Sequence, residues 1–444
     1  MHSIATMHIF ETHATELTLK LINKLTTPNA RLETIIDVTD RLAKHFTNKP
    51  GTINRIATCK IPEPSTIILA LIRLATIYTP EQRPLEIKKW ISGNIPWLDT
   101  NTITHISNVS LAVLTYLEEW LEYSQAHMVL SKEQISTRIY RHLNCLIAGL
   151  GTTALFYGVI PQATNQMDII AYLFVVAGCY TLLDHLVDNV GSSQSNTTKQ
   201  ALLIFDWYIT QLESGSHTQP FPQYPSDQLT PVMQEYNRAI YWLIGLLVRS
   251  VHIPEVVGIV RLCFKVEIRC FREQTLSSQS PESIIQLGVL KGLSTGYLIS
   301  QGALTTLYSE YSVLIQLLDD LSDYMEDSSA GIRGFPACAH GLEDYAILVG
   351  ECLAEFIDSY SKCLARDPDL LLGGPDAAEY VIPALIMYWI YCMCKTPQLA
   401  DLARECIARF GLDEIMDPCR TLESRREKHA SLQNLWKIMK LFRV

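Results

Sequence analysis

The sequence LIQLLDDLSDYMED occupies residues 314–327 and runs from an apolar helical pattern into five acidic residues within nine positions, with no basic residue among them. On a helix, Asp319, Asp323 and Asp327 lie at i, i+4 and i+8, so their carboxylates share one face. Like charges at this spacing repel one another. Carboxylate oxygens are the ligands that Mg2+ prefers, usually together with substrate phosphates. The stretch therefore predicts either a solvated acidic helix end or part of a magnesium site.

A second acidic pair follows another apolar run. Residues 169–183 are nearly all apolar and lead without a turn signal into Asp184 and Asp188, which are again at i and i+4. Carboxylates beside an apolar face are usually paired or bound to a metal. An acid pair at the C-terminal end of a helix is the alternative, and the helix dipole disfavours it. Two such helices could face one another across a cavity and hold metal ions between them.

The chain has 444 residues, of which 18% are charged, so it can bury a sizeable core in one large domain or two. Helical patterns separated by Pro and Gly breaks run along its length, whereas strand-like alternation is scarce and no fixed repeat emerges. The predicted fold class is all-α, with predicted helices that include residues 15–24, 342–366 and 399–410. A weak boundary near residues 126–132 separates an N-terminal helical region, residues 1–130, in which no chemistry is visible, from residues 131–444, which carry both acidic motifs.

Charge and cysteine usage limit the partners and the compartment. A net charge of -10 without a dense basic stripe argues against nucleic acid as a partner. The twelve cysteines include no Cys-x-x-Cys, so we expect buried free thiols in a reducing compartment. The N-terminus lacks a secretory pattern, and the longest apolar runs are about fifteen residues, short for a membrane span. We expect a cytoplasmic protein, with mean hydropathy leaving room for peripheral membrane contact.

Basic residues recur on one predicted helix and in one loop. The helix over residues 256–274 carries basic residues at spacings of four, four and three, namely Arg261, Lys265, Arg269 and Arg272. Such a face is either a salt-bridged surface or the counterpart of a polyanionic ligand. The loop at residues 328–336 contributes Arg333. Lys265, Arg269 and Arg333 are the candidate anchors for an anionic ligand.

Glycines interrupt another predicted helix, over residues 284–308. Its sequence reads KGLSTG at residues 291–296. A glycine-bearing break in a buried helix marks either the close approach of a ligand or tight helix packing. Both interpretations stay open at this point.

Acidic helices, basic groups and an apolar interior together suit an allylic diphosphate. The carboxylates would hold Mg2+, the metal and basic groups would take the charge of the leaving diphosphate, and the isoprenoid tail would lie in the apolar centre. The resulting carbocation must be kept from water, and aromatic faces can stabilise it. Tyr180 precedes Asp184 by one helical turn, and Tyr308 and Tyr311 precede Asp319 by two to three turns. These tyrosines are cavity candidates, or ordinary core residues.

The two motifs carry a family resemblance. YTLLDHLVDN at residues 180–189, LDDLSD at residues 318–323 running into Glu326 and Asp327, and the glycine-bearing loop to Phe335 resemble the tetraprenyl-β-curcumene synthase family of bacterial large-terpene synthases. The similarity covers roughly residues 135–350. It implies the α-helical fold that this family shares with squalene and phytoene synthases, here a single large helical bundle with an additional N-terminal helical region.

The resemblance also implies roles for the acids. Mg2+ would be bound by the catalytic residues Asp184, Asp188, Asp319 and Asp323, and by Glu326 and Asp327. The metal would trigger departure of the diphosphate. The first motif of the family usually opens with a further Asp, where this chain has Thr181. The resemblance therefore leaves open whether this chain differs from the family in the number of metal ions it binds or in the substrates it accepts.

The predicted function is that of a class I terpene synthase, a lyase that ionises a linear, long-chain prenyl diphosphate and cyclises or eliminates the cation to a hydrocarbon. Head-to-head prenyl coupling stays open. A chain-elongating polyprenyl synthase would explain the Asp-Asp-x-x-Asp form at residues 319–323, but its second motif with paired arginines is missing. A non-catalytic helical scaffold is the alternative from another class. Neither the chain length of the substrate, nor the product, nor the choice between monomer and homodimer follows from the sequence.

Overall fold

The computed structural model describes residues 2–26, 34–47, 78–79, 81–94, 279–300, 305–368, 370 and 374–412, with isolated residues between 100 and 274. Every regular element in this part of the chain is a helix and none is a strand, so the predicted all-α class is confirmed there. The helices are α1 (His2–Thr26), α2 (Ile35–Thr47), α5 (Arg83–Asn94), α12 (Pro281–Ile299), α13 (Thr306–Ser322), α14 (Tyr324–Ala330), η3 (Phe335–Cys338), α15 (Leu342–Arg366), α16 (Gly374–Lys395), η4 (Pro397–Leu399) and α17 (Ala400–Phe410).

The chain groups into two compact units. Unit 1 comprises Met1–Asn54, Leu155–Gln166 and His252–Leu422, and unit 2 comprises Arg55–Ala154, Met167–Val251 and Glu423–Val444. All the helices named above except α5 belong to unit 1. The boundary predicted between residues 1–130 and 131–444 stays a prediction.

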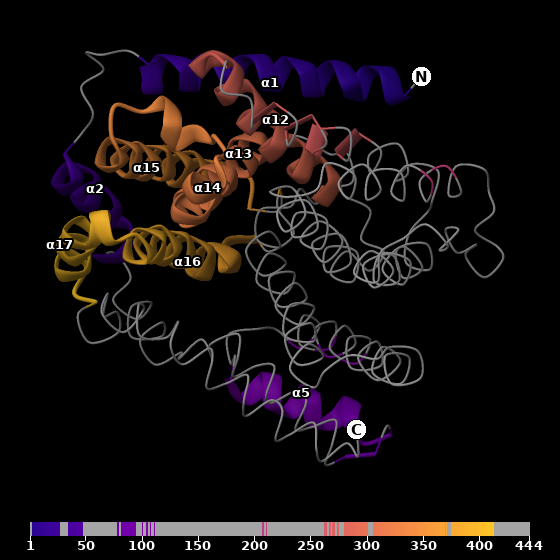
Figure 1. Cartoon of the computed structure of the whole chain (residues 1–444). Coiled ribbons are helices and arrows are strands. Elements are labelled where there is room, and N and C mark those ends of the chain that lie inside the picture. Colours follow the sequence, from indigo (N-terminus) through magenta and orange to yellow (C-terminus); the bar gives the residue numbers. More distant parts are fainter. Residues whose placement is uncertain are drawn as a thin grey trace, which may run out of the picture. The chain divides into compact units, whose positions relative to one another are not determined.

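Helix α13 is the centre of unit 1. It contacts α12, α15 and α16, as Figure 1 shows, and also α1, α14 and η3. Thr305 caps its N-terminus by accepting a hydrogen bond from the backbone N–H of Tyr308 at 3.2 Å. Three of its leucines, Leu314, Leu317 and Leu318, are at most 2% exposed. Each contributes about 1.5–3 kcal/mol through burial, which fixes α13 in the core.

Helix α12 crosses α13 closely because Gly292 and Gly296 lie on the face that meets α13. A Cβ at Gly292 would lie 3.0 Å from the carbonyl oxygen of Ser312, and one at Gly296 would lie 2.6 Å from the Ser312 Cβ. Gly288 faces the ring of Phe335 in the same way. The prediction that a helix over residues 284–308 is interrupted at 291–296 is wrong, since α12 is continuous through these glycines and ends at Ile299. Their role is helix packing.

Buried hydrogen bonds hold α15 and α16 against each other and against α13. The Tyr345 hydroxyl donates to the carbonyl of Leu317 at 2.8 Å, and the Trp389 indole N–H donates to the carbonyl of Ala346 at 3.0 Å. Tyr345 and Trp389 are fully buried. Buried polar atoms of this kind need partners, so these bonds fix the mutual position of the three helices.

Helices α1 and α2 cover other parts of unit 1. Helix α1 packs on α12, where the rings of Phe10 and Tyr297 lie 5.8 Å apart. Helix α2 packs against α15 and α17, and Arg409 donates to Asp40 at 2.6 Å. The amphipathic pattern over residues 15–24 predicts only part of α1, which begins at His2 and ends at Thr26.

The described residues bear on two predictions, the free state of the cysteines and the lack of a membrane span. The eight cysteines that the structure describes are free thiols, six of them buried, as predicted. Burial raises the pKa of the Cys352 thiol to about 11. Within the described ranges, no helix combines the length and the apolar character that a membrane crossing requires.

Candidate functional site

The acidic stretch lies where α13 meets α14. Helix α13 ends at Ser322, and Asp323, with φ of -102° and ψ of 5°, separates it from α14. The backbone N–H of Asp323 still donates to the carbonyl of Asp319, and that of Asp327 to the carbonyl of Asp323, both at 2.9 Å. The acids therefore follow one another around a bend and do not form the uniform helical face that their spacing predicts.

Asp320 has a structural role at this junction. Its side chain is buried; Oδ1 accepts a hydrogen bond from Nε2 of Gln316 at 2.7 Å, and Oδ2 accepts one from the backbone N–H of Phe335 at 2.9 Å. Gly334 lies against the carboxylate, where a Cβ would be 3.0 Å from Cγ of Asp320. Burial raises the pKa of Asp320, an effect that the bond from Gln316 and the charge of Lys291 oppose. Asp320 thus fixes the loop before η3 to α13.

Asp323 is paired with a lysine from α16. Nζ of Lys395 lies 3.2 Å from Oδ1 of Asp323 and donates to Oγ of Ser322 at 2.6 Å. The side chain of Lys395 is 19% exposed and that of Asp323 is 43% exposed. Sequence reasoning missed this lysine because it lies 72 residues after Asp323. The local sequence gives no signal for the pair.

Tyr388 lies two helical turns before Lys395 and shares its face of α16. Its phenol lies near Ser322 and the carboxylates of Asp319 and Asp323. Burial raises the pKa of the Tyr388 phenol well above its ordinary value, and the charges of Asp319 and Asp323 add to the increase. We call Asp319, Ser322, Asp323, Tyr388 and Lys395 the α13–α16 polar cluster.

The remaining predicted metal ligands have different positions. Glu326 is exposed and Asp327 is partly buried, both in the first turn of α14. Asp184 and Asp188 lie outside the residues that the structure describes, as does Thr181. Among the described residues, no three His, Cys, Asp or Glu side chains are placed to share a metal ion. Asp319 and Asp323 supply the hard oxygen donors that suit Mg2+, which one or two carboxylates and substrate phosphates can hold together.

Two of the three predicted diphosphate anchors, Arg269 and Arg333, lie among the described residues, and each is bonded to other protein groups. Nε of Arg269 lies 2.9 Å from Oε1 of Glu273, and the arginine side chain is 51% exposed. Nη1 of Arg333 donates to the carbonyl of Gln279 at 3.3 Å, and its backbone N–H donates to the carbonyl of Gln274 at 3.3 Å. Arg333 therefore ties the loop after α14 to the segment before α12. Lys265 lies outside the described residues.

The predicted cavity tyrosines on α13 belong to a row of buried rings. The ring centroids of Tyr308 and Tyr311 are 6.4 Å apart, and those of Tyr311 and Phe356 are 5.1 Å apart. Phe356 stacks in turn on Tyr360 at 5.6 Å. Tyr308 and Tyr311 are fully buried, so in this structure they pack in the core between α13 and α15. Tyr180 lies outside the described residues.

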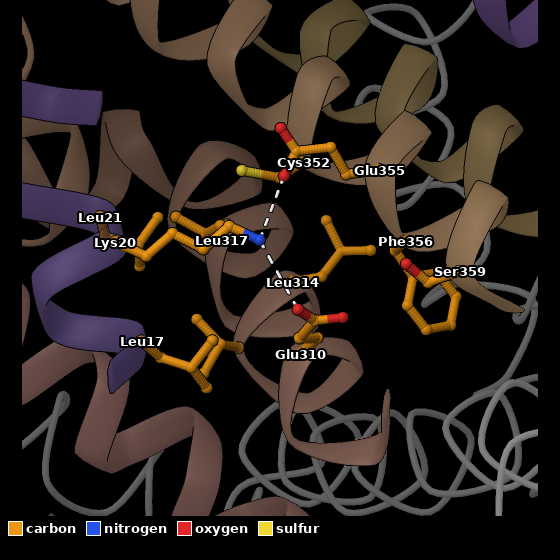
Figure 2. A pocket seen from close by; sticks show the side chains of 11 residues that line it. Leu17, Lys20, Leu21, Glu310, Leu314, Leu317, Cys352, Glu355, Phe356 and Ser359 are labelled. Carbon is orange, nitrogen blue, oxygen red and sulfur yellow. Dashed lines mark ion pairs between the residues drawn. The ribbon is translucent and has the colours of Figure 1, made fainter. Parts of the chain in front are cut away.

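A small recess lies between α1, α13 and α15 and contains none of the predicted site residues (Figure 2). Its volume is about 50 Å³, and leucines line much of it. Nζ of Lys20 lies 3.6 Å from Oε1 of Glu310 and 3.1 Å from Oε2 of Glu355 at this recess. Sites for small molecules usually measure about 300–1,000 Å³. The recess can hold a few water molecules and is too small for a prenyl chain.

No protein family, curated protein or solved structure matches this chain. The family resemblance therefore rests on the two acidic motifs and their surroundings in the sequence. What the structure adds is the α13–α16 polar cluster, in which two carboxylates, a hydroxyl, a phenol and an ammonium group meet at the end of an apolar helix. Such a cluster can bind a cation through its carboxylates and an anion through its lysine.

Proposed function

We propose that the chain is a class I terpene synthase with a helical bundle of the isoprenoid synthase type. It would ionise a linear, long-chain prenyl diphosphate in the presence of Mg2+ and cyclise or eliminate the cation to a hydrocarbon. The observation that supports this most is the position of Asp319 and Asp323 at the C-terminal end of α13. Two carboxylates add to the negative end of the helix dipole there, and Nζ of Lys395 lies 3.2 Å from Oδ1 of Asp323.

The predicted acidic and basic site residues would each have a role in binding the metal or the diphosphate. Asp319 and Asp323 would hold the metal from α13, and Asp184 and Asp188 would hold it from the first motif. Mg2+, when bound, supplies the charge that neutralises a leaving diphosphate. Arg333 would bind the diphosphate, and its backbone bond to Gln274 would keep its loop in place. The apolar interior would exclude water from the cation.

The test is an incubation of the purified protein and Mg2+ with geranyl, farnesyl, geranylgeranyl, geranylfarnesyl and longer prenyl diphosphates, each alone. Diphosphate release and mass spectrometry of the organic extract are the two readouts. We expect a Mg2+-dependent hydrocarbon from one substrate. Release only with two substrates, or with added isopentenyl diphosphate, would indicate coupling or elongation. Asp319→Asn and Asp323→Asn should each lower release at least about 100-fold. Asp401→Asn, whose side chain is 88% exposed on α17, is the matched control.

A non-catalytic helical scaffold is the second candidate, and one observation favours it. Asp320 and Asp323 already have protein partners, so packing and pairing explain part of the acidic stretch without a metal. A scaffold would show no diphosphate release with any substrate. Its melting temperature would not rise with Mg2+ and diphosphate, because a ligand that does not bind the folded state does not stabilise it.

A further inference from the structure

Lys395 places a positive charge where the proposed function requires a metal ion. Its ammonium group contacts Oδ1 of Asp323 at 3.2 Å and Oγ of Ser322 at 2.6 Å, and most of its side chain is shielded from solvent. Mg2+ binds carboxylate oxygens at about 2.0–2.1 Å. An ammonium group and a metal ion therefore cannot both approach Oδ1 of Asp323 from the same side.

The local structure holds the backbone of Lys395 near this position. Lys395 is the last residue of α16, where the helix dipole favours a cation. The next residue, Thr396, is fully buried, and its backbone N–H donates to the carbonyl of Met393 at 3.1 Å. The backbone is thus held, while the four-carbon stem allows the ammonium group to move.

We propose that Lys395 is an internal counter-cation that occupies Asp323 until a metal-bound diphosphate arrives, so that the divalent ion alone binds weakly and loads together with the diphosphate. This rests on the proposed function, because it assigns Asp323 to the metal. Once a metal ion takes Asp323, the displaced ammonium group would lie beside a second positive charge. A diphosphate removes that repulsion, since its oxygens can accept hydrogen bonds from Lys395 while they bind the metal.

Binding of the metal ion and binding of the diphosphate are then coupled, and this coupling is reciprocal. If the anion raises the affinity for the metal, the metal must raise the affinity for the anion by the same factor. Lys395 is then the residue that creates the coupling, because its ammonium group competes with the metal ion for Asp323. The ammonium group thereby keeps the site closed to free divalent cations, and the device needs no large movement of the backbone.

The test uses full-length protein and Mn2+ as a substitute for Mg2+, with free Mn2+ measured by electron paramagnetic resonance. Lys395→Gln should bind Mn2+ alone about tenfold more tightly than the native chain, the effect of removing one partly shielded opposing charge. Lys395→Arg keeps the charge and should bind like the native chain. Lys362→Gln, an exposed position on α15, is the matched control. Inorganic diphosphate should strengthen Mn2+ binding by the native chain more than binding by Lys395→Gln.

A second substitution locates the ion. Asp323→Asn, added to Lys395→Gln, should abolish the gain in Mn2+ affinity. The proposal is overturned if Lys395→Gln binds Mn2+ no better than the native chain, including the case in which neither binds, or if the gain survives Asp323→Asn. Circular dichroism checks that each variant is folded. Lys395→Met, which keeps the apolar stem, takes the place of Lys395→Gln if that variant unfolds.

The outcomes separate the two proposals. A tighter Mn2+ site in Lys395→Gln, with no release of diphosphate from any prenyl diphosphate, upholds the counter-cation and overturns the terpene synthase. Turnover of a prenyl diphosphate with unchanged Mn2+ affinity upholds the enzyme and overturns the counter-cation.

Discussion

Oδ2 of Asp320 accepts a hydrogen bond from the backbone N–H of Phe335 at 2.9 Å, which joins the end of α13 to the start of η3. We expect Asp320→Ala to destabilise the folded state by about 2 kcal/mol, because it leaves a buried N–H group without an acceptor. Urea unfolding followed by circular dichroism measures this loss. Asp320→Asn keeps an acceptor oxygen and should lose less than half as much. An equal loss in both variants would show that the charge, and not the hydrogen bond, is what matters.

Glu355 should make stability depend on pH. Burial tends to raise the pKa of this carboxyl, but its hydrogen bond and charge interactions with Lys24 and Lys20 outweigh burial and lower the pKa below 4.5. A depressed folded-state pKa adds stability above 4.5 that disappears as the pH falls through the folded-state value. Because the side chain is 37% exposed, solvent screening limits the contribution to about 1 kcal/mol or less.

The comparison for Glu355 is between the native chain and Glu355→Gln. Their free energies of unfolding should differ at about pH 7 and converge as the pH falls through the folded-state pKa of Glu355. Glu343→Gln, at an exposed position in the first turn of the same helix, is the control and should show little change between these conditions. A Glu355 difference that persists at low pH would contradict the role of its ion pairs.

Gly296→Ala should separate α12 from α13. The added Cβ would lie 2.6 Å from the Ser312 Cβ, so the helices must shift, and overpacking of this kind destabilises by about 1–3 kcal/mol. Thermal and urea unfolding measure the loss, and adding Ser312→Gly should restore part of it. Gly93→Ala in α5 is the control: no atom lies within 4 Å of its added Cβ, so a neutral or slightly stabilising effect is expected.

Arg333→Ala tests the predicted anchor for the diphosphate. If this side chain binds the leaving group, release of diphosphate should fall by about 10–100-fold while Mn2+ binding is retained. The measurement is turnover of the prenyl diphosphate that the native chain accepts. Arg404→Ala, with a side chain that is 62% exposed on α17, is the control. Unchanged turnover would remove Arg333 from the site and leave it the structural role that its bond to Gln279 indicates.

Local sequence was sufficient for much of the helical structure. The predicted helix over residues 342–366 coincides with α15, and the prediction for residues 399–410 differs from α17 by one residue. Apolar periodicity and breaks act over a few residues, so a single sequence contains them. The longer prediction over residues 284–308 failed, because it joined α12 and the start of α13, and because glycines that pack against a neighbouring helix look in sequence like helix breaks.

The site could be predicted only in part. The acidic spacing pointed to Asp319, Asp323 and Asp327 on one helical face, and it gave no separate role to Asp320. The structure separates them, since Asp320 is buried against the N–H of Phe335 and Asp323 pairs with Lys395. Burial and distant partners give these neighbouring carboxylates different roles, and neither property is contained in their spacing.

By itself, the sequence determined the helical class of the described residues and the position of an acidic segment after an apolar helix. Both depend on interactions between residues a few positions apart. Only the tertiary structure decided which acid is structural, why positions 292 and 296 have no room for a side chain, and which cation faces Asp323. Lys395 lies 72 residues from Asp323, and the packing of α16 on α13 brings the two together. That packing depends on the shapes of whole buried surfaces, which no short pattern of residues specifies.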